Sequence, residues 1–154
     1  MKKYYQTDEL QKLIDWDKLM KLPRYAGGHD DQMISLFKDS ELIAHWNLGD
    51  YQGEVATCVR LADNMFVIYN DYYGSCGGCD SWEDANDTEV RNMCINLSNG
   101  AYVFKSILDV IEFLNSTGVD KSFGWNTLTS KGLLNEILKN ITITREVKID
   151  GIIN

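Results

Sequence analysis

The sequence predicts an α+β domain in which a mostly antiparallel β-sheet is flanked by several helices. Two patterns predict this class. Apolar and polar residues alternate between residues 41 and 71, as in half-buried strands, and apolar residues recur at helical spacing on both sides of that segment. The chain has 154 residues, of which 44% are hydrophobic. This length and composition fit a single domain covering residues 1–154.

The segment 41–71 is predicted to form an antiparallel hairpin or meander. A strand begins at residue 41, and the alternation points Leu42, Ala44 and Trp46 to one side of it. Short turn sequences such as Gly49-Asp50 separate the apolar runs. The two strands that follow are expected at 53–60 and 65–71.

The first 40 residues are predicted to contain two helices. Thr7 is a suitable N-cap for a helix over 8–21, and Pro23 ends that helix. A short second helix is expected near 30–38, where apolar residues recur at helical spacing.

The second half of the chain combines helices with short strands. At the C-terminus, Ile141, Ile143, Val147 and Ile149 alternate with polar residues, which predicts a half-buried C-terminal strand over 141–149. The elements before it are a helix that Asp87 caps and Gly100 ends, a strand at 101–105, a helix that Ser106 caps and Gly118 ends, and a helix at 130–139.

Charge is distributed unevenly along the chain. The formal net charge is −8, which argues against binding nucleic acid over a broad surface, because phosphate binding needs a basic face. Residues 30–89 hold 13 acids and two bases, a balance of −11, whereas the rest of the chain has a balance of +3. The middle segment is therefore either an ordinary solvated face or an acidic surface that attracts a basic partner or a metal.

The sequence predicts a cytoplasmic protein that does not bind membranes. No apolar run approaches the roughly 20 residues of a membrane span, and no apolar segment of a secretion signal follows the first residues. In the cytoplasm, the four cysteines are expected to be thiols or metal ligands rather than disulfides.

The loop with the sequence YYGSCGGCD, at 72–80, has the clearest chemistry in the chain. Cys76 and Cys79 are separated by two glycines, which allow a tight backbone reversal that turns both sulfurs toward one point. This is half of a tetrahedral zinc site, so we expect a structural zinc ion. The candidates for the remaining ligands are Asp80, His45, Cys58, Cys94, Glu83, Asp84 and Asp50.

Each candidate ligand also has a plainer interpretation. Cys94 lies on the apolar face of a predicted helix and Cys58 on a strand, where buried inert thiols are common. His45 fits a hydrogen-bonded sheet histidine, and Asp80 fits an Asx-type cap.

A redox site and an inert loop are the alternatives to zinc at Cys76 and Cys79. A thioredoxin-like site places its CxxC at a helix N-terminus within a βαβ unit. This chain lacks the βαβ pattern, and the acidic residues that follow Cys79 disfavour a thiolate while they are compatible with a dication.

Aromatic and acidic residues around this loop are candidate partner contacts. Core packing is expected for Trp46 and Tyr69, but other aromatics are predicted to lie in loops and suit a protein interface. The expected contact residues are Tyr72, Tyr73, Asp80, Trp82, Glu83, Asp84 and Asp87.

No catalytic constellation stands out. The chain has two histidines and no G-x-S-x-G, P-loop or G-x-G-x-x-G motif. The run His29-Asp30-Asp31 resembles a metal or acid–base cluster, but in a Gly-rich loop it is more typical of a turn followed by a helix N-cap. We therefore expect a protein that is not an enzyme, the alternative being a metal- or thiol-dependent enzyme centred on Cys76 and Cys79.

The stretch from about 42 to 89 contains GDYQG, a predicted hairpin and YYGSCGGCDSWEDA. It resembles small phage and prophage proteins that share a YGSCxGCD core. The chain also resembles phage anti-CRISPR proteins of the type II-A group, some of which carry zinc. The motif covers about a third of the chain and includes Cys76, Cys79 and Asp80.

This resemblance implies a phage-encoded inhibitor of host defence in the cytoplasm of an infected or lysogenic bacterial cell. Such an inhibitor binds the type II CRISPR effector nuclease and blocks the loading or cleavage of target DNA. The nuclease has basic channels for the guide–target duplex, on which an acidic protein can dock without binding nucleic acid itself. A phage structural or regulatory domain, in which the Cys loop only stabilises the fold, is the remaining alternative.

Overall fold

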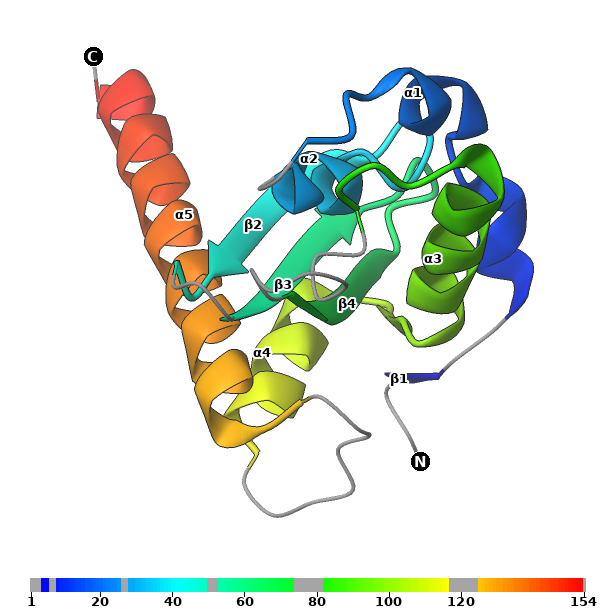
Figure 1. Cartoon of the computed structure of the whole chain (residues 1–154). Helices are drawn as coiled ribbons and strands as arrows, with labels where there is room; N and C mark the ends of the chain where they lie inside the picture. Colours follow the sequence, from blue (N-terminus) through cyan, green and yellow to red (C-terminus); the bar gives the residue numbers. More distant parts are fainter. Residues whose placement is uncertain are drawn as a thin grey trace.

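The predicted meander forms three neighbouring strands, β4, β3 and β2, at one side of an antiparallel sheet whose strand order is β1-β5-β4-β3-β2 (Figure 1). The computed structural model describes residues 4–5, 8–25, 28–49, 53–73, 82–116 and 125–153. Within them the α+β class is confirmed. The strands are β1 (Tyr4–Tyr5), β2 (Glu41–Asn47), β3 (Gly53–Arg60), β4 (Phe66–Tyr73) and β5 (Tyr102–Phe104). The helices are η1 (Asp8–Leu13, a 3-10 helix), α1 (Trp16–Lys21), α2 (His29–Ile34), α3 (Asp87–Asn99), α4 (Ile107–Asn115) and α5 (Thr127–Ile153).

The sheet separates two hydrophobic cores, because successive strand residues point to opposite faces. Helices η1, α1, α2 and α3 cover one face, here called the α3 face, and α4 and α5 cover the other, the α5 face (Figure 1). In β3, for example, Val55 and Val59 belong to the core of the α3 face, whereas Ala56 and Cys58 belong to that of the α5 face.

Strand β2 contains an irregularity that the alternating pattern does not predict. The pairing with β3 shifts between Leu42, opposite Val59, and Ala44, opposite Cys58, so that Ile43 is an extra residue. The expectation that Leu42 and Ala44 point the same way is therefore wrong. Leu42 lies on the side of Val59 and is 44% exposed, while Ala44 is buried in the core of the α5 face.

The predicted helix over 8–21 is two helices. Residue Ile14 pairs with Phe37 in an isolated bridge, and the backbone N–H of Asp15 donates to the carbonyl of Leu36. These contacts break the helix, and the side chain of Asp15 then caps α1 by accepting from the backbone N–H of Lys18. The predicted second helix, 30–38, is also shorter in the structure, where α2 ends at Ile34.

The N-caps of α3 and α4 lie within one residue of the predicted positions. Ser106 caps α4, as predicted. At α3 the N-cap is Asn86 and not Asp87, because the side chain of Asn86 accepts from the backbone N–H of Glu89 while Glu89 accepts from the backbone N–H of Asn86.

The predicted C-terminal strand at 141–149 is wrong, because α5 is helical from Thr127 to Ile153. Ile137 is fully buried and Ile141, one helical turn later, packs against the same core of the α5 face. Extending an existing helix adds a hydrogen bond per residue without a new nucleation step. The alternation of isoleucine and threonine therefore does not decide the conformation here.

Candidate functional site: an acidic loop and a polar network

The residues expected to bind zinc are not brought together in the described part of the chain. Cys76, Cys79 and Asp80 lie outside the described residues, as do Asp50 and the side chain of Tyr73. Among the residues that the structure describes, no group of three or more His, Cys, Asp or Glu side chains is placed to hold a metal ion.

His45 is engaged in hydrogen bonds at both ring nitrogens. Its Nδ1 lies 2.8 Å from Oγ1 of Thr57 on the neighbouring strand, and its Nε2 lies 2.5 Å from Oδ1 of Asp30. A metal would have to displace one of these partners. The structure therefore agrees with the plainer interpretation of His45 as a hydrogen-bonded sheet histidine.

Cys58 and Cys94 lie in the two different cores. Cys58 is buried on the α5 face and Cys94 on the α3 face, so the sheet stands between them. Burial raises the pKa of both thiols. Since zinc binds the thiolate, neither position favours a ligand, and the two cannot share one ion.

Trp82 is a core residue, and its predicted role as an exposed partner contact is wrong. Its side chain is fully buried, and its Nε1–H donates to the carbonyl of Pro23 at 3.0 Å. The ring also packs against Gly28, where an added Cβ would lie 2.8 Å from Nε1. Trp82 therefore fixes the start of the segment that leads into α3.

The acidic loop, defined as residues 82–89 and so including the first residues of α3, begins at this anchor and points its carboxylates to solvent. The side chains of Glu83, Asp84, Asp87 and Glu89 are exposed. Tyr72, on β4, is also exposed, at 59%. Glu83, Asp84, Asp87 and Tyr72, which were predicted as partner contacts, thus have the exposure that such a contact requires.

Arg24 holds the acidic loop in place from the N-terminal side. The backbone N–H of Asp84 donates to the Arg24 carbonyl at 3.1 Å, and the Arg24 guanidinium donates to the carbonyl of Ala85 at 2.8 Å. The same guanidinium pairs with Asp87 at 2.7 Å. Asp84 has a φ of 56°, a left-handed conformation that few non-glycine residues adopt. The loop is therefore fixed by buried and backbone contacts while its carboxylates stay exposed.

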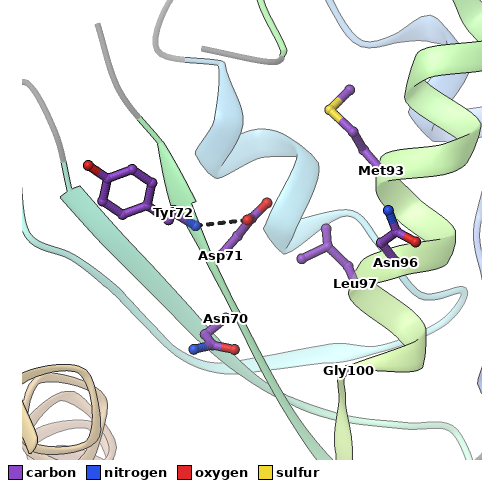
Figure 2. Close-up of a pocket in the computed structure, with 7 residues that line it drawn as sticks. All are labelled: Asn70, Asp71, Tyr72, Met93, Asn96, Leu97 and Gly100. Carbon is purple, nitrogen blue, oxygen red and sulfur yellow. Dashed lines mark hydrogen bonds between the residues drawn. The ribbon is translucent and has the colours of Figure 1, made fainter. Parts of the chain in front are cut away.

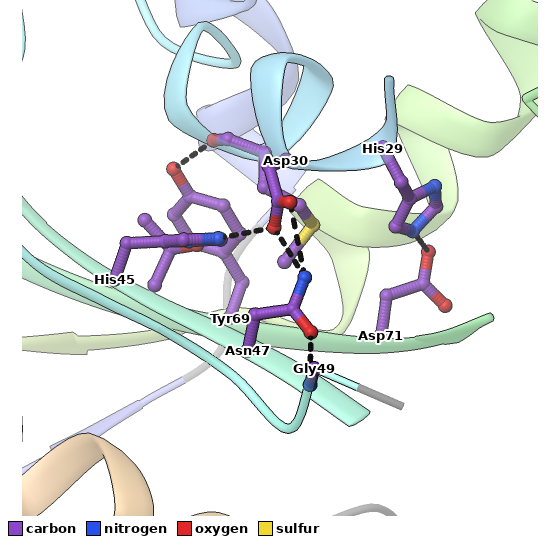
Figure 3. Close-up of polar contacts among 9 residues, drawn as sticks. His29, Asp30, His45, Asn47, Gly49, Tyr69 and Asp71 are labelled. Carbon is purple, nitrogen blue, oxygen red and sulfur yellow. Dashed lines mark hydrogen bonds and ion pairs between the residues drawn. The ribbon is translucent and has the colours of Figure 1, made fainter. Parts of the chain in front are cut away.

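A polar network lies on the same α3 face, around Asp30 at the start of α2 (Figure 3). Oδ1 of Asp30 faces His45, and the Asn47 side chain donates to both carboxylate oxygens at 2.8 and 3.0 Å. The hydrogen bond from His45, followed by that from Asn47, lowers the pKa of Asp30 despite its partial burial.

A second histidine–aspartate pair lies beside the first. Nε2 of the buried His29 is 3.0 Å from Oδ2 of Asp71 on β4, and the other carboxylate oxygen of Asp71 accepts from the backbone N–H of Tyr72 at 2.8 Å (Figures 2 and 3). Asp71 is thus oriented from two sides.

A pocket of about 200 Å³ lies between β4 and the C-terminal half of α3 (Figure 2). The Asp71 side chain points from β4 toward α3, whereas the Tyr72 ring points to the opposite side of the strand. The lining residues are Asn70, Asp71 and Tyr72 from β4, Met93, Asn96 and Leu97 from α3, and Gly100 after it.

The sequence does not predict the two histidine–aspartate pairs or the pocket. Asp30 and His45 are 15 residues apart, and His29 and Asp71 are 42 apart. The alternation placed His45 and Asn47 on one face of their strand, which was the one available signal. It could not show that α2 would cross that face.

Comparison with known proteins does not extend this description. No family model, no curated protein and no solved structure matches the chain. None of the described helices is long and apolar enough to span a membrane.

Proposed function

We propose that the chain is a non-enzymatic protein-binding domain whose acidic loop, 82–89, docks on a basic surface of its partner. The observation that supports this is the combination of exposed carboxylates with a rigidly held backbone. Trp82 is fully buried, and Arg24 bonds both to the backbone of the loop and to Asp87. A loop fixed before binding loses little conformational entropy when the complex forms.

The charge of the loop favours a basic partner and fast association. Four exposed acids lie within seven residues, at 83, 84, 87 and 89, and Asp87 is paired with Arg24. Such a field steers a partner of opposite charge and weakens with salt. The resemblance to phage anti-CRISPR proteins points to a type II effector nuclease as that partner and to inhibition of target-DNA loading or cleavage as the effect.

The test is the capture of purified effector nucleases, with and without guide RNA, followed by a target-cleavage assay. We expect capture, loss of cleavage and a binding affinity that falls as ionic strength rises. Absence of binding to each of several orthologues would overturn the assignment of the nuclease as the partner.

A charge-reversed loop tests whether the acidic loop is the contact. Glu83→Lys with Asp84→Asn removes two negative charges and adds a positive one, and asparagine tolerates the left-handed backbone at position 84. The matched control is Glu112→Lys with Asp39→Asn, since Glu112 is exposed on α4 and Asp39 has a φ of 54°. We expect at least tenfold weaker binding for the loop variant and less than twofold for the control. Equal losses would show a general charge effect.

The same proposal includes a structural zinc ion bound by Cys76 and Cys79, with Asp80 as a third candidate ligand. It is supported by the CxxC spacing and by the resemblance, while His45, Cys58 and Cys94 do not fit as further ligands. Elemental analysis of purified protein should find one zinc per chain, and less would overturn it. Cys76→Ser with Cys79→Ser should lower the melting temperature, and a chelator should destabilise the wild type but not this variant.

A further inference from the structure

We propose that the pocket between β4 and the last turns of α3 binds the guanidinium group of an arginine side chain. That this arginine belongs to a protein partner rests on the proposed function, whereas the affinity of the pocket for the group does not. Three features of the pocket favour this ligand: its size, the sign of its charge and the geometry of the Asp71 carboxylate.

The size of the pocket fits a single side chain. Its volume is about 200 Å³, whereas sites for cofactors and drug-sized ligands typically hold roughly 300–1,000 Å³. Its walls include the apolar side chains of Met93 and Leu97 beside the polar groups of Asn70, Asp71 and Asn96. An arginine has the same division, with an apolar stem and a charged head.

The charge of the pocket favours a cation. Asp71 contributes a carboxylate, and the pocket is lined from the other side by the C-terminal end of α3, where Asn96, Leu97 and Gly100 lie. The last carbonyls of a helix give that end a partial negative charge, which basic residues in the last turn often compensate. The last turn of α3 has no basic residue. A bound cation would supply that missing charge.

The carboxylate of Asp71 selects a planar, forked donor. Each of its oxygens already has one hydrogen-bond partner. Oδ2 is paired with Nε2 of His29, and Oδ1 accepts from the backbone N–H of Tyr72. A carboxylate has about four acceptor positions, so one remains on each oxygen. A guanidinium donates two parallel N–H bonds to such a pair, whereas an ammonium group makes a single-point contact.

The acidic loop runs into the start of α3, and the pocket lies beside the end of the same helix. One partner can therefore contact both. The loop leads into α3 at Asp87, and Leu97 lies ten residues further on. Ten helical residues span roughly 15 Å, which is less than the width of an interface of about 800 Å² per partner. An arginine in the pocket would therefore fix the orientation of a partner that the loop attracts.

The direct test is an NMR titration of the full chain with Nα-acetyl-arginine methylamide. We expect saturable amide shifts at residues 70–72 and 96–100, with a dissociation constant on the order of millimolar. The citrulline analogue, which has the same shape without the charge, should bind at least tenfold more weakly, and the lysine analogue should bind more weakly than arginine. Absence of saturable shifts, or equal binding of citrulline, would overturn the proposal.

Two asparagine-to-lysine variants, one at the pocket and one at another helix end, test where the probe binds. Asn96→Lys places a cation at the pocket and at the helix end, where it is tolerated, and should abolish binding of the probe. The control Asn115→Lys makes the same change at the exposed end of α4, whose last turn also lacks a basic residue. Binding should be unchanged in the control, and equal effects of the two variants would contradict the location.

The outcome separates this proposal from the proposed function. The loop variant Glu83→Lys with Asp84→Asn should bind the arginine probe within twofold of the wild type, because neither substituted residue lines the pocket and both are exposed to screening by salt. If the arginine probe binds but no protein partner is captured, the affinity of the pocket is established and the docking role of the loop is refuted. Partner binding that survives Asn96→Lys unchanged would refute the role of the pocket in that complex.

Discussion

The two faces of the sheet contain different kinds of buried side chain. On the α5 face, Phe113 contacts the rings of Tyr102, Phe104 and Trp125, with centroids 5.2 to 6.2 Å apart, in a core of aromatic and aliphatic groups. Both faces bury small hydroxyl side chains, such as Thr57 on the α3 face and Thr129 and Ser130 on α5, but among the described residues the buried histidine, His29, and the buried amide, Gln32, are both on the α3 face. Both histidine–aspartate pairs, the pocket and the acidic loop are on or beside this second face.

The difference shows where stability and recognition are separated in this molecule. An apolar core such as that of the α5 face stabilises the fold without selecting a ligand. Buried polar groups on the α3 face cost free energy unless they are paired, so their presence indicates a requirement other than packing. Substitutions on each face should therefore have different consequences.

The largest expected effect is that of Trp82→Ala on the α3 face. The variant removes a fully buried indole and its hydrogen bond to Pro23, and should lower the free energy of unfolding by about 3–5 kcal/mol. Urea unfolding followed by circular dichroism measures the loss. Trp82→Phe should lose clearly less, and a loss below about 1 kcal/mol for the alanine variant would mean that Trp82 does not anchor the loop.

The next effect is on the α5 face, where Gly132→Ala should destabilise the protein by about 1–3 kcal/mol. Alanine is favoured over glycine inside a helix by about 1 kcal/mol, but a Cβ at this position would lie 2.1 Å from the ring of Trp46. Overpacking is therefore expected to exceed the gain in helix propensity. Thermal unfolding measures whether Gly132→Ala lowers or raises the stability. In a chain that also carries Trp46→Leu, the clash is removed, and Gly132→Ala should then stabilise the protein.

A smaller and pH-dependent effect is expected from Asp30→Asn. The pKa of Asp30 is held below its ordinary value of 3.8, mainly by the hydrogen bond with His45. Its carboxylate therefore stabilises the fold at pH values above the unfolded pKa, and that contribution is lost as pH falls through the folded pKa. Asp30→Asn should cost about 1 kcal/mol near pH 7, since the group is 38% exposed. The gap between wild type and variant should narrow as pH falls below the ordinary value of 3.8, and a gap that is constant with pH would contradict the assignment.

The smallest effect concerns the reactivity of the buried thiols. Cys58 and Cys94 are buried in the two cores, and burial raises the pKa of each. Neither should react with a thiol reagent at neutral pH until the chain unfolds, because the reagent needs an accessible thiolate. Mass spectrometry after brief labelling identifies the modified residues. Labelling of Cys94 but not Cys58 in native protein would show that the α3 face opens more readily.

Local sequence patterns predicted the elements whose signals are local. The strand at 53–60 was predicted to the residue, and Ser106 was identified as the cap of α4, because alternation and capping depend on neighbours in sequence. The C-terminal strand failed for a related reason. A two-residue repeat around Ile143 competed with the helical spacing of Ile137 and Ile141, and packing against the sheet decided the outcome.

The candidate site was less predictable than the fold. Exposure of Glu83 and Asp84 followed from their charge, but the burial of Trp82 depends on Pro23 and Gly28, about 60 and 54 residues earlier in the chain. The pocket depends on how the end of α3 packs beside β4. Contacts of this kind arise from tertiary structure, and no spacing within the sequence encodes them.

The extra residue in β2 changes which insertions and deletions this strand can accept. Removing Ile43 would restore a regular ladder and keep His45 and Asn47 facing Asp30, at the loss of the hydrogen bond that the Ile43 carbonyl accepts from Asn140. Removing Trp46 instead would make His45 and Asn47 neighbours in the strand, so that they would point to opposite faces and could not both contact Asp30. The strand can therefore lose one residue at Ile43 without disturbing the polar network on the α3 face.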